Sequence, residues 1–441
     1  MIEIDKNLKI MIATFFIAFL ITLIPFPAQF TLNARIMIAI AFIAVVFWVT
    51  ECIPIPVTAL LVILMQGLFG IMPFADSFSY IAHPVNALII AGFVIAGSLK
   101  KYGLDKRIGL KIVSFMGDST NQLVLGVMIA TAFLSMWISN TAATAIMIPI
   151  GIGVLKKASN GNHGNNMSKV MVIGTAFAAN IGGIGTPLGT PPVPITIGFL
   201  NELAGISISF FDWIVRAIPI VIILIPVTWK LLTIIYPPEI KKVEGGMKSV
   251  KKELIEMGKF TKKQKHVVIL FIIAIILWFL DSLGFILPLP ENWIYLASLI
   301  IALMYVFPGV GVLSWKEAEK EINWGILILI GGGLALGSGL QKAGVIEIIA
   351  RYMESFLIGT SLFTVIAAVA LITAFSITLF SSLTATSSTF VPVAIALAMK
   401  LDLSPLLLAL VAGVASCFAF LLPVNTPPNA ISYDTGYFKT T

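Results

Sequence analysis

Long apolar stretches recur along the chain and are separated by short polar connections. A transmembrane helix needs about 20 predominantly apolar residues, and we predict ten such spans. These runs are too long and too continuous for the alternating strands of a β-barrel, so the pattern predicts an all-α polytopic membrane protein. The predicted spans lie at roughly 9–26, 36–50, 54–72, 85–99, 168–182, 211–235, 265–283, 293–307, 322–340 and 404–422.

Composition and charge agree with this pattern. Hydrophobic residues make up 59% of the 441 residues, charged residues only 11%, and mean hydropathy is +1.03, which a soluble core could not accommodate. In a soluble protein a net charge of +7 could suggest nucleic-acid binding. Here the topology of a membrane protein explains it better, because nine lysines cluster in one connection between Tyr236 and Lys265. By the positive-inside rule we expect this segment and the N-terminus in the cytoplasm, with the protein in the inner (plasma) membrane.

Two apolar stretches, 122–155 and 361–398, are too long for one span and are interrupted by polar residues near their middles. A hairpin that enters the membrane, turns near the midplane and returns fits both, because unpaired backbone at that depth is tolerated only beside a cavity. The interrupting residues are Ser135, Ser139, Asn140 and Thr141 in the first stretch, and Ser376, Thr378, Ser381, Ser382 and Thr384 in the second.

Motifs from the first half return in the same order about 240 residues later. Ser139-Asn140-Thr141 matches Ser382-Leu383-Thr384, and Gly189-Thr190-Pro191-Pro192 matches Asn425-Thr426-Pro427-Pro428. Five spans per half, after one extra helix, would place the second copy upside down in the membrane. We therefore predict two inverted-topology repeats, each with a re-entrant hairpin and a broken helix.

This division predicts four segments. Residues 1–35 form an N-terminal scaffold helix, and 36–235 form the first repeat with its hairpin at 122–155. A cytoplasmic lysine-rich linker or interfacial helix follows at 236–265. The second repeat occupies 266–441 with its hairpin at 361–398, and a final helix to match 211–235 is expected to be absent from the chain.

The hairpin tips and the Thr-Pro-Pro loops are the candidate binding elements. Half-helix N-termini carry about +0.5 of an elementary charge and can hold an anion without charged side chains. Buried charge is expensive at the bilayer midplane, and neutral hydroxyls and amides avoid that cost. A single polar tip is better explained as contact between helices, but the matched pair favours a binding site. The candidate substrate-binding residues are Ser139, Asn140, Thr141, Ser382, Thr384, Thr190, Pro191, Asn425, Thr426 and Pro427.

These residues resemble those of the divalent anion/sodium symporter family of dicarboxylate transporters. The resemblance rests on the signature from Trp48 to Leu61, the paired tips and the two Thr-Pro-Pro loops, and it covers nearly the whole chain. It implies a homodimer in which a transport domain moves by an elevator mechanism against a scaffold. It also implies C4 or C5 dicarboxylates such as succinate, malate, fumarate or 2-oxoglutarate as substrates, or citrate.

The resemblance also assigns two sodium sites, and this sequence departs from one of them. The first would use Ser135, Ser139, Asn140 and the Gly189 carbonyl, all of which are present. The second would use Thr378, Ser381, residue 383 and the carbonyl of Asn425. The family has Asn at the third of these positions, where this chain has Leu383. Leucine offers no oxygen to a hard cation.

With the second site in doubt, we predict a sodium-independent dicarboxylate exchanger, with a sodium-coupled symporter using the first site as the alternative. Moving two negative charges against a membrane potential costs about 2.3 kcal/mol per charge per 100 mV, and exchange of one dianion for another avoids this cost. An anion channel and a non-transporting scaffold are the remaining alternatives. The sequence contains no Walker loop or catalytic triad, which argues against an enzyme or an ATP-driven pump, and no organic cofactor is predicted.

Overall fold

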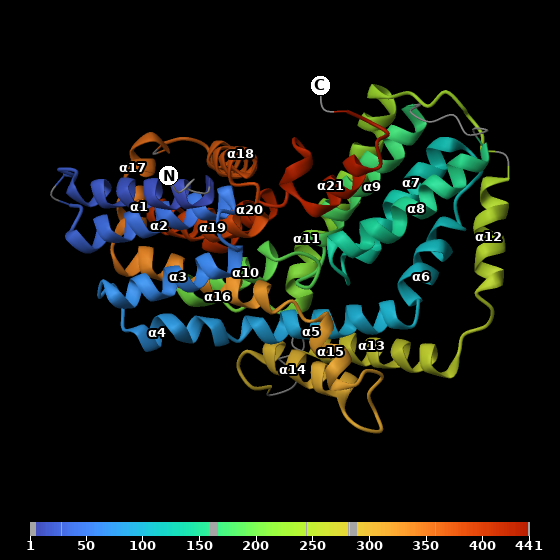
Figure 1. Ribbon diagram of the computed structural model, residues 1–441, viewed down its shortest axis with the longest axis horizontal. Coiled ribbons are helices and arrows are strands. Elements are labelled where there is room, and N and C mark those ends of the chain that lie inside the picture. Colours follow the sequence, from blue (N-terminus) through green and yellow to red (C-terminus); the bar gives the residue numbers. More distant parts are fainter. Residues whose placement is uncertain are drawn as a thin grey trace, which may run out of the picture. The chain divides into compact units, whose positions relative to one another are not determined.

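The computed structural model describes residues 6–27, 29–158, 166–243, 245–280, 282, 289–357 and 359–439, and α-helices form its architecture (Figure 1). The predicted all-α membrane fold is therefore confirmed. The helices divide into two compact units, each assembled from three separate stretches of chain. Unit 1 holds residues 1–86, 191–208 and 323–418, and unit 2 holds 87–190, 209–322 and 419–441.

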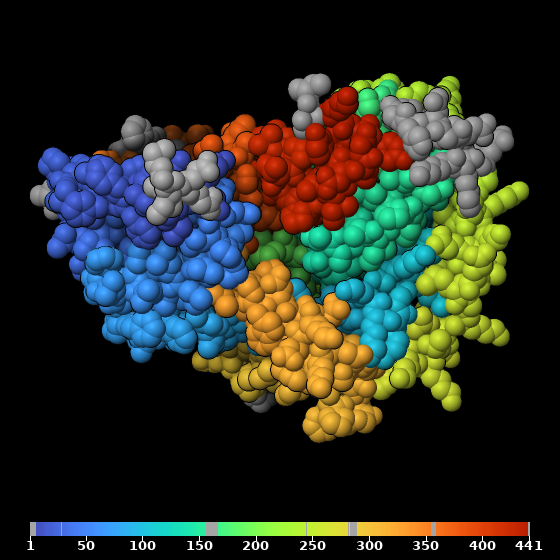
Figure 2. Space-filling model, in the orientation of Figure 1, coloured from blue at the N-terminus to red at the C-terminus, as the bar shows by residue number. Residues whose placement is uncertain are grey.

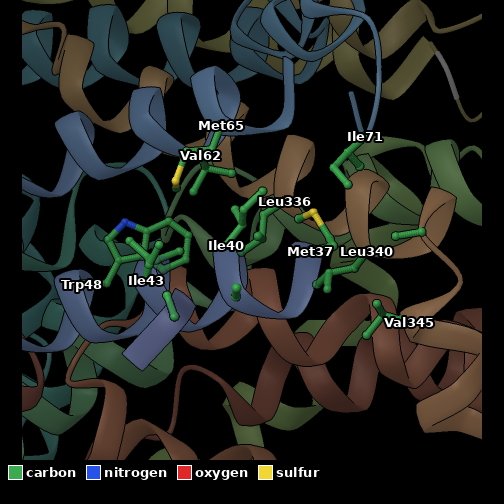
Figure 3. Close-up of a cluster of buried hydrophobic side chains, with 14 of the residues drawn as sticks. Met37, Ile40, Ile43, Trp48, Val62, Met65, Ile71, Leu336, Leu340 and Val345 are labelled. Carbon is green, nitrogen blue, oxygen red and sulfur yellow. The ribbon is translucent and has the colours of Figure 1, made fainter. Parts of the chain in front are cut away.

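Unit 1 is built around a cluster of buried apolar side chains. Trp48, Met37 and Ile40 pack with Leu336 and Leu340 in its interior (Figure 3). Its helices are α1 (Lys6–Leu23), α2 (Leu32–Thr50), α3 (Ile55–Leu68), α4 (Phe74–Ser79), α10 (Pro192–Ala204), α16 (Trp324–Lys342), α17 (Val345–Leu357), α18 (Leu362–Phe380), α19 (Leu383–Lys400) and α20 (Pro405–Ala415).

Unit 2 is centred on α7, α8 and α9, which pack side by side (Figure 1). Most of α5 (Val85–Lys101) belongs to it. Its remaining helices are α6 (Leu104–Val113), α7 (Thr120–Ser135), α8 (Asn140–Ala158), α9 (Asn166–Gly183), α11 (Phe210–Ile235), α12 (Gly246–Glu256), α13 (Lys262–Leu280), α14 (Trp293–Val306), α15 (Trp315–Glu321) and α21 (Pro427–Asp434).

Eight helices among the described residues are long and apolar enough to cross a membrane, whereas ten full-length spans were predicted. Six of the eight correspond to predicted spans, and the other two are α18 and α19 from the second interrupted stretch. The predicted runs at 54–72, 293–307 and 404–422 form shorter helices, because glycine, proline and polar residues end α3, α14 and α20 early. The run at 168–182 forms α9, but the two asparagines, the lysine and the glycines of this helix leave it outside the eight.

Both long interrupted stretches fold as two helices joined by a short break. The first stretch gives α7 and α8 with the break at 136–139, and the second gives α18 and α19 with the break at Ser381 and Ser382. The helices of each pair pack against one another. Their second helices also match in a detail, since α8 contains Pro149 and α19 contains Pro392. Re-entry of these pairs into the membrane remains a prediction.

The two units draw corresponding helices from opposite halves of the chain. In unit 2, α21 packs on α8 and α9; in unit 1, α10 packs on α19 and α20. Each unit therefore joins the hairpin of one predicted repeat to the helix that follows the Thr-Pro-Pro loop of the other. The compact units thus cut across the predicted segments 36–235 and 266–441. The inverted orientation of the repeats stays a prediction.

Two connections between helices outside the hairpins also have a defined structure. The lysine-rich linker contains α12, on which Lys248 and Lys251 are exposed. Figure 2 shows long side chains projecting from the yellow-green surface of this part of the chain. Between α2 and α3 the backbone turns at Glu51, which adopts a left-handed conformation with φ of 48° and closes the end of α2. Glu51 is therefore a turn residue between these two helices.

Candidate functional site

The tip of the first hairpin carries a serine cap and a buried amide. The Ser139 hydroxyl accepts a hydrogen bond of 3.3 Å from the backbone N–H of Ala142, so it caps the N-terminus of α8. Asn140, the first residue of α8, is buried although it is polar. The positive end of the α8 dipole therefore lies at this tip, beside neutral polar groups.

The Asn140 side chain lies among oxygen atoms contributed by three segments. Its inner amide atom is 2.6 Å from Ser135 Oγ, 3.1 Å from the Gly189 carbonyl oxygen and 3.3 Å from the Ala179 carbonyl oxygen. Ser135 Oγ itself donates to the Ala179 carbonyl over 2.8 Å. Three of the four predicted ligands of the first cation site, Ser135, Asn140 and Gly189, are thus brought together within unit 2.

The close approach of these segments depends on glycine. A Cβ on Gly189 would lie 2.6 Å from the Ser135 carbonyl oxygen, and a Cβ on Gly183 would collide with the Asn140 amide. Gly183 also ends α9, so the negative end of that helix dipole faces the same cluster. One helix thus brings its positive end to this point and another its negative end.

The chemistry of this cluster fits a hard cation. If the Asn140 nitrogen faces inward, it donates to the surrounding oxygens. If its oxygen faces inward, it meets three more oxygens with only the single Ser135 proton to share, and a cation would satisfy all of them. Oxygen atoms, including backbone and amide carbonyls, are the ligands that hard cations prefer.

The loop before α21 contributes a second set of polar contacts in unit 2. The Asn180 amide donates to Thr426 Oγ1 over 3.3 Å and to Asn429 Oδ1 over 3.1 Å. Thr426 in turn caps α21, and the Asn425 side-chain oxygen accepts from the backbone N–H of Leu422 over 2.9 Å. Asn180 and Asn429 were not among the predicted site residues. The sequence signal that could have identified them is an asparagine within a helix. Both asparagines are buried in the structure.

Several buried polar atoms of unit 2 have no hydrogen-bond partner among the described residues. They include Thr190 Oγ1, Thr144 Oγ1 and the Asn180 side-chain oxygen. Unpaired polar groups are costly to bury, and in proteins they often mark places that water or a ligand satisfies. Thr190, a predicted substrate-binding residue, is only 2% exposed.

The second hairpin tip repeats the serine cap but lacks the amide. Ser382 accepts from the Ala385 N–H over 3.3 Å and caps α19, as Ser139 caps α8. Leu383, the first residue of α19, takes the position of Asn140. Ser381 adopts a left-handed conformation with φ of 46°, which is strained for a residue with a side chain.

The predicted residues divide between the two units. Unit 1 holds the second tip and Pro191. At this tip Thr384 is buried, and Thr378 Oγ1 is buried without a hydrogen-bond partner among the described residues. Unit 2 holds Ser139, Asn140, Thr141, Gly189, Thr190, Asn425, Thr426 and Pro427. The second predicted sodium site therefore draws its residues from both units. A single site that joins both tips stays a prediction.

Comparison with known proteins places this fold and these motifs in a family. The family model of the sodium:sulfate symporter transmembrane region matches residues 5–441. The chain belongs to this family. The resemblance drawn from the tips and the Thr-Pro-Pro loops is thereby confirmed, and so is the prediction of a membrane transporter rather than an enzyme.

Individual relatives give a consistent picture. The chain is 32% identical to the sodium-dependent dicarboxylate transporter SdcS of Staphylococcus saprophyticus, over 95% of this chain and 83% of the relative. It is 34% identical to the protein of the same name from Staphylococcus aureus USA300, with the same coverage. The YdaH transporter of Alcanivorax borkumensis has a similar fold, with a TM-score of 0.55 over 80% of this chain and 78% of that structure, at 14% identity.

Proposed function

We propose that this protein is a secondary transporter that couples the uptake of C4 or C5 dicarboxylates to sodium. The observation that carries the proposal is the oxygen cluster that Ser135, Ala179 and Gly189 form around the Asn140 side-chain amide in unit 2. The names of the SdcS relatives, which describe sodium-dependent dicarboxylate transporters, support it.

The sodium-independent exchange predicted from Leu383 finds no support in these relatives, and sodium coupling, the alternative reading, fits them better. A chain with one sodium site can still couple transport to the sodium gradient. Leu383 then reduces the number of coupled sodium ions without removing the coupling. The cation would use Ser135, Ser139, Asn140 and the Gly189 carbonyl.

The helix ends suggest how substrate and cation act together. The N-terminus of α8 offers backbone N–H groups and the Ser139 hydroxyl to a carboxylate, while the carbonyls at the end of α9 face a cation. A cation held beside Asn140 adds positive charge next to the carboxylate position. In this proposal sodium therefore binds with the dicarboxylate and strengthens its affinity.

The proposal is tested with purified protein in proteoliposomes and labelled succinate outside. Empty vesicles are compared with vesicles preloaded with succinate, each with an inward gradient of sodium or potassium. We expect uptake into empty vesicles that requires sodium. Uptake that needs internal succinate and ignores sodium would restore the exchanger, and flux that follows voltage without saturation would favour a channel.

Assembly and movement follow from the family resemblance alone. A homodimer with an elevator-type motion, and a cytoplasmic N-terminus in the plasma membrane, remain part of the proposal. Cross-linking of single cysteines introduced on the protein surface in native membranes would test the dimer. Labelling of a cysteine placed before α1 from one side of the membrane would test the orientation.

A further inference from the structure

A large cavity in unit 2 is lined by none of the residues of the oxygen cluster and has no part in the proposed transport chemistry. Its volume is about 830 Å³, and residues of α5, α6, α7, α12 and α13 line it. That volume falls within the range of about 300–1,000 Å³ typical of ligand pockets. Its lining is aliphatic and aromatic except for two cationic side chains, Arg107 and Lys111.

The two cations lie one helical turn apart on α6 and therefore share a face. The Arg107 guanidinium stacks over the Phe260 ring, 4.1 Å from its centroid, and donates to the Gly258 carbonyl. The Lys111 ammonium lies 4.9 Å from the centroid of the Phe115 ring. Neither side chain forms an ion pair within the part of the chain that the structure describes. Their positive charge is thus left for an anion.

The cavity also reaches the first hairpin tip. Trp137 and Ile138 line it, and these two residues belong to the break between Ser135 and Ser139. The Trp137 ring packs edge-on against Phe271 of α13, with centroids 4.8 Å apart. Its indole nitrogen is buried and has no acceptor among the described residues.

We propose that this cavity binds one anionic phospholipid, with the phosphate at Arg107 and Lys111 and an acyl chain extending along Phe271 toward Trp137. Charge complementarity selects an anion, and the long apolar lining selects a hydrocarbon chain. The short hydrocarbon backbone of a C4 or C5 dicarboxylate is too small to fill this space. Basic pockets beside transmembrane helices are where anionic headgroups bind, and α13 is one of the helices able to span a membrane.

A lipid in this position would also bear on the site chemistry. Its acyl chain would pack on the tip residues Trp137 and Ile138. These lie between Ser135 and Ser139, which are candidate cation ligands. Occupancy would then restrain the backbone that carries those ligands. Lipid binding itself does not depend on the proposed function, so its test can succeed or fail independently of transport.

The test is native mass spectrometry of the full-length protein in detergent, titrated with phosphatidylglycerol or phosphatidylcholine. Arg107→Gln with Lys111→Gln should weaken phosphatidylglycerol binding about 30-fold, and Lys111→Gln alone about 5-fold, since each basic group near a headgroup contributes roughly fivefold in affinity. The matched control is Lys248→Gln with Lys251→Gln, which removes the same charge from exposed positions of α12 that do not line the cavity. It should bind like the parent protein.

A second variant separates the chain from the headgroup. Ile129→Trp places a large ring in the cavity while keeping both cations, and should also abolish the bound phosphatidylglycerol. Quenching of Trp137 fluorescence by phosphatidylglycerol with brominated acyl chains, measured as the difference from Trp137→Phe, should report the chain at the tip. Equal binding of phosphatidylcholine, unchanged binding in Lys111→Gln, or quenching that Trp137→Phe leaves intact would each overturn the proposal.

Discussion

The side-chain amide of Asn140 lies 3.1 Å from the carbonyl oxygen of Gly189. The first residue of α8 and the loop that follows α9 thereby meet at one polar point, 49 positions apart in the sequence. Asn140 and Gly189 belong to the two motifs that recur in the second half of the chain. The recurrence therefore marks segments that the fold brings together in unit 2.

Replacing Asn140 with leucine would give the first tip the side chain that the second tip already has. We expect Asn140→Leu to weaken the apparent sodium affinity of succinate uptake about 10- to 100-fold, because a buried oxygen partner is lost at a cost of about 1–3 kcal/mol. Sodium titration of uptake in proteoliposomes measures this. Asn121→Leu, at an exposed position of the same hairpin, should leave the titration unchanged.

An unchanged sodium titration in Asn140→Leu would contradict the assignment of the cation to this cluster. A general loss of folding would be visible as a lower thermal midpoint and a broad elution profile. Asn140→Asp provides a further arm, because it keeps an oxygen and adds negative charge. It should retain sodium dependence while succinate affinity falls.

Leu383→Asn makes the reverse change at the second tip. If Leu383 is the reason for a missing sodium site, an added amide oxygen at the start of α19 should increase the number of coupled sodium ions. The Hill coefficient for sodium should then rise from about one toward two, as expected for a second coupled site. Leu383→Ala, which removes hydrocarbon without supplying an oxygen, is the control and should keep the parent's coefficient. No rise in Leu383→Asn would refute the second-site interpretation.

Gly189→Ala tests the close backbone approach. An added Cβ would lie 2.6 Å from the Ser135 carbonyl oxygen, closer than such atoms can pack, so the loop must move away from Asn140. We expect a loss of stability of about 1–3 kcal/mol and strongly reduced uptake. Gly153→Ala in α8 is the matched control, since a Cβ there meets no atom within 4 Å. Equal thermal midpoints and uptake for the two variants would contradict the packing argument.

The sequence predicted the breaks in both hairpins because their polar residues cannot be hidden in a continuous apolar helix. It predicted Asn140 and Gly189 as one site through the family resemblance, and the structure brings them together. It did not predict Asn180, which belongs to no recurring motif, or Asn429, which directly follows the second Thr-Pro-Pro motif. The contact of each asparagine with a distant segment exists only in the folded chain.

The division of the helices into two units also could not be predicted from the sequence pattern. The sequence shows that α10 and α21 each follow a Thr-Pro-Pro loop, but it does not show which helices pack against them. The prediction of consecutive repeats assigned α10 to the first half and α21 to the second. The structure packs α10 with α19 and α20, and α21 with α8 and α9, so each unit is completed by the other half of the chain.

The ion pair between Lys101 and Glu317 predicts a pH dependence of stability. The Lys101 ammonium lies 2.7 Å from the Glu317 carboxylate, and Ser314 donates to the same side chain from its backbone and its hydroxyl. These bonds, that of Lys101 foremost, lower the pKa of Glu317 from 4.5 to about 2. A lowered carboxyl pKa stabilises the fold above the unfolded value and is lost as the pH falls through the folded one.

Glu317→Gln should therefore lower the thermal midpoint at pH 6, and the difference from the parent protein should shrink as the pH falls from 4.5 toward 2, the range between the two pKa values. Glutamine can still accept from Ser314, so the variant isolates the charge of the pair. Glu319→Gln, exposed on the same helix and in no ion pair among the described residues, is the control. A difference between Glu317→Gln and the parent that stays constant down to pH 2 would mean that the carboxylate charge does not hold α15 to α5.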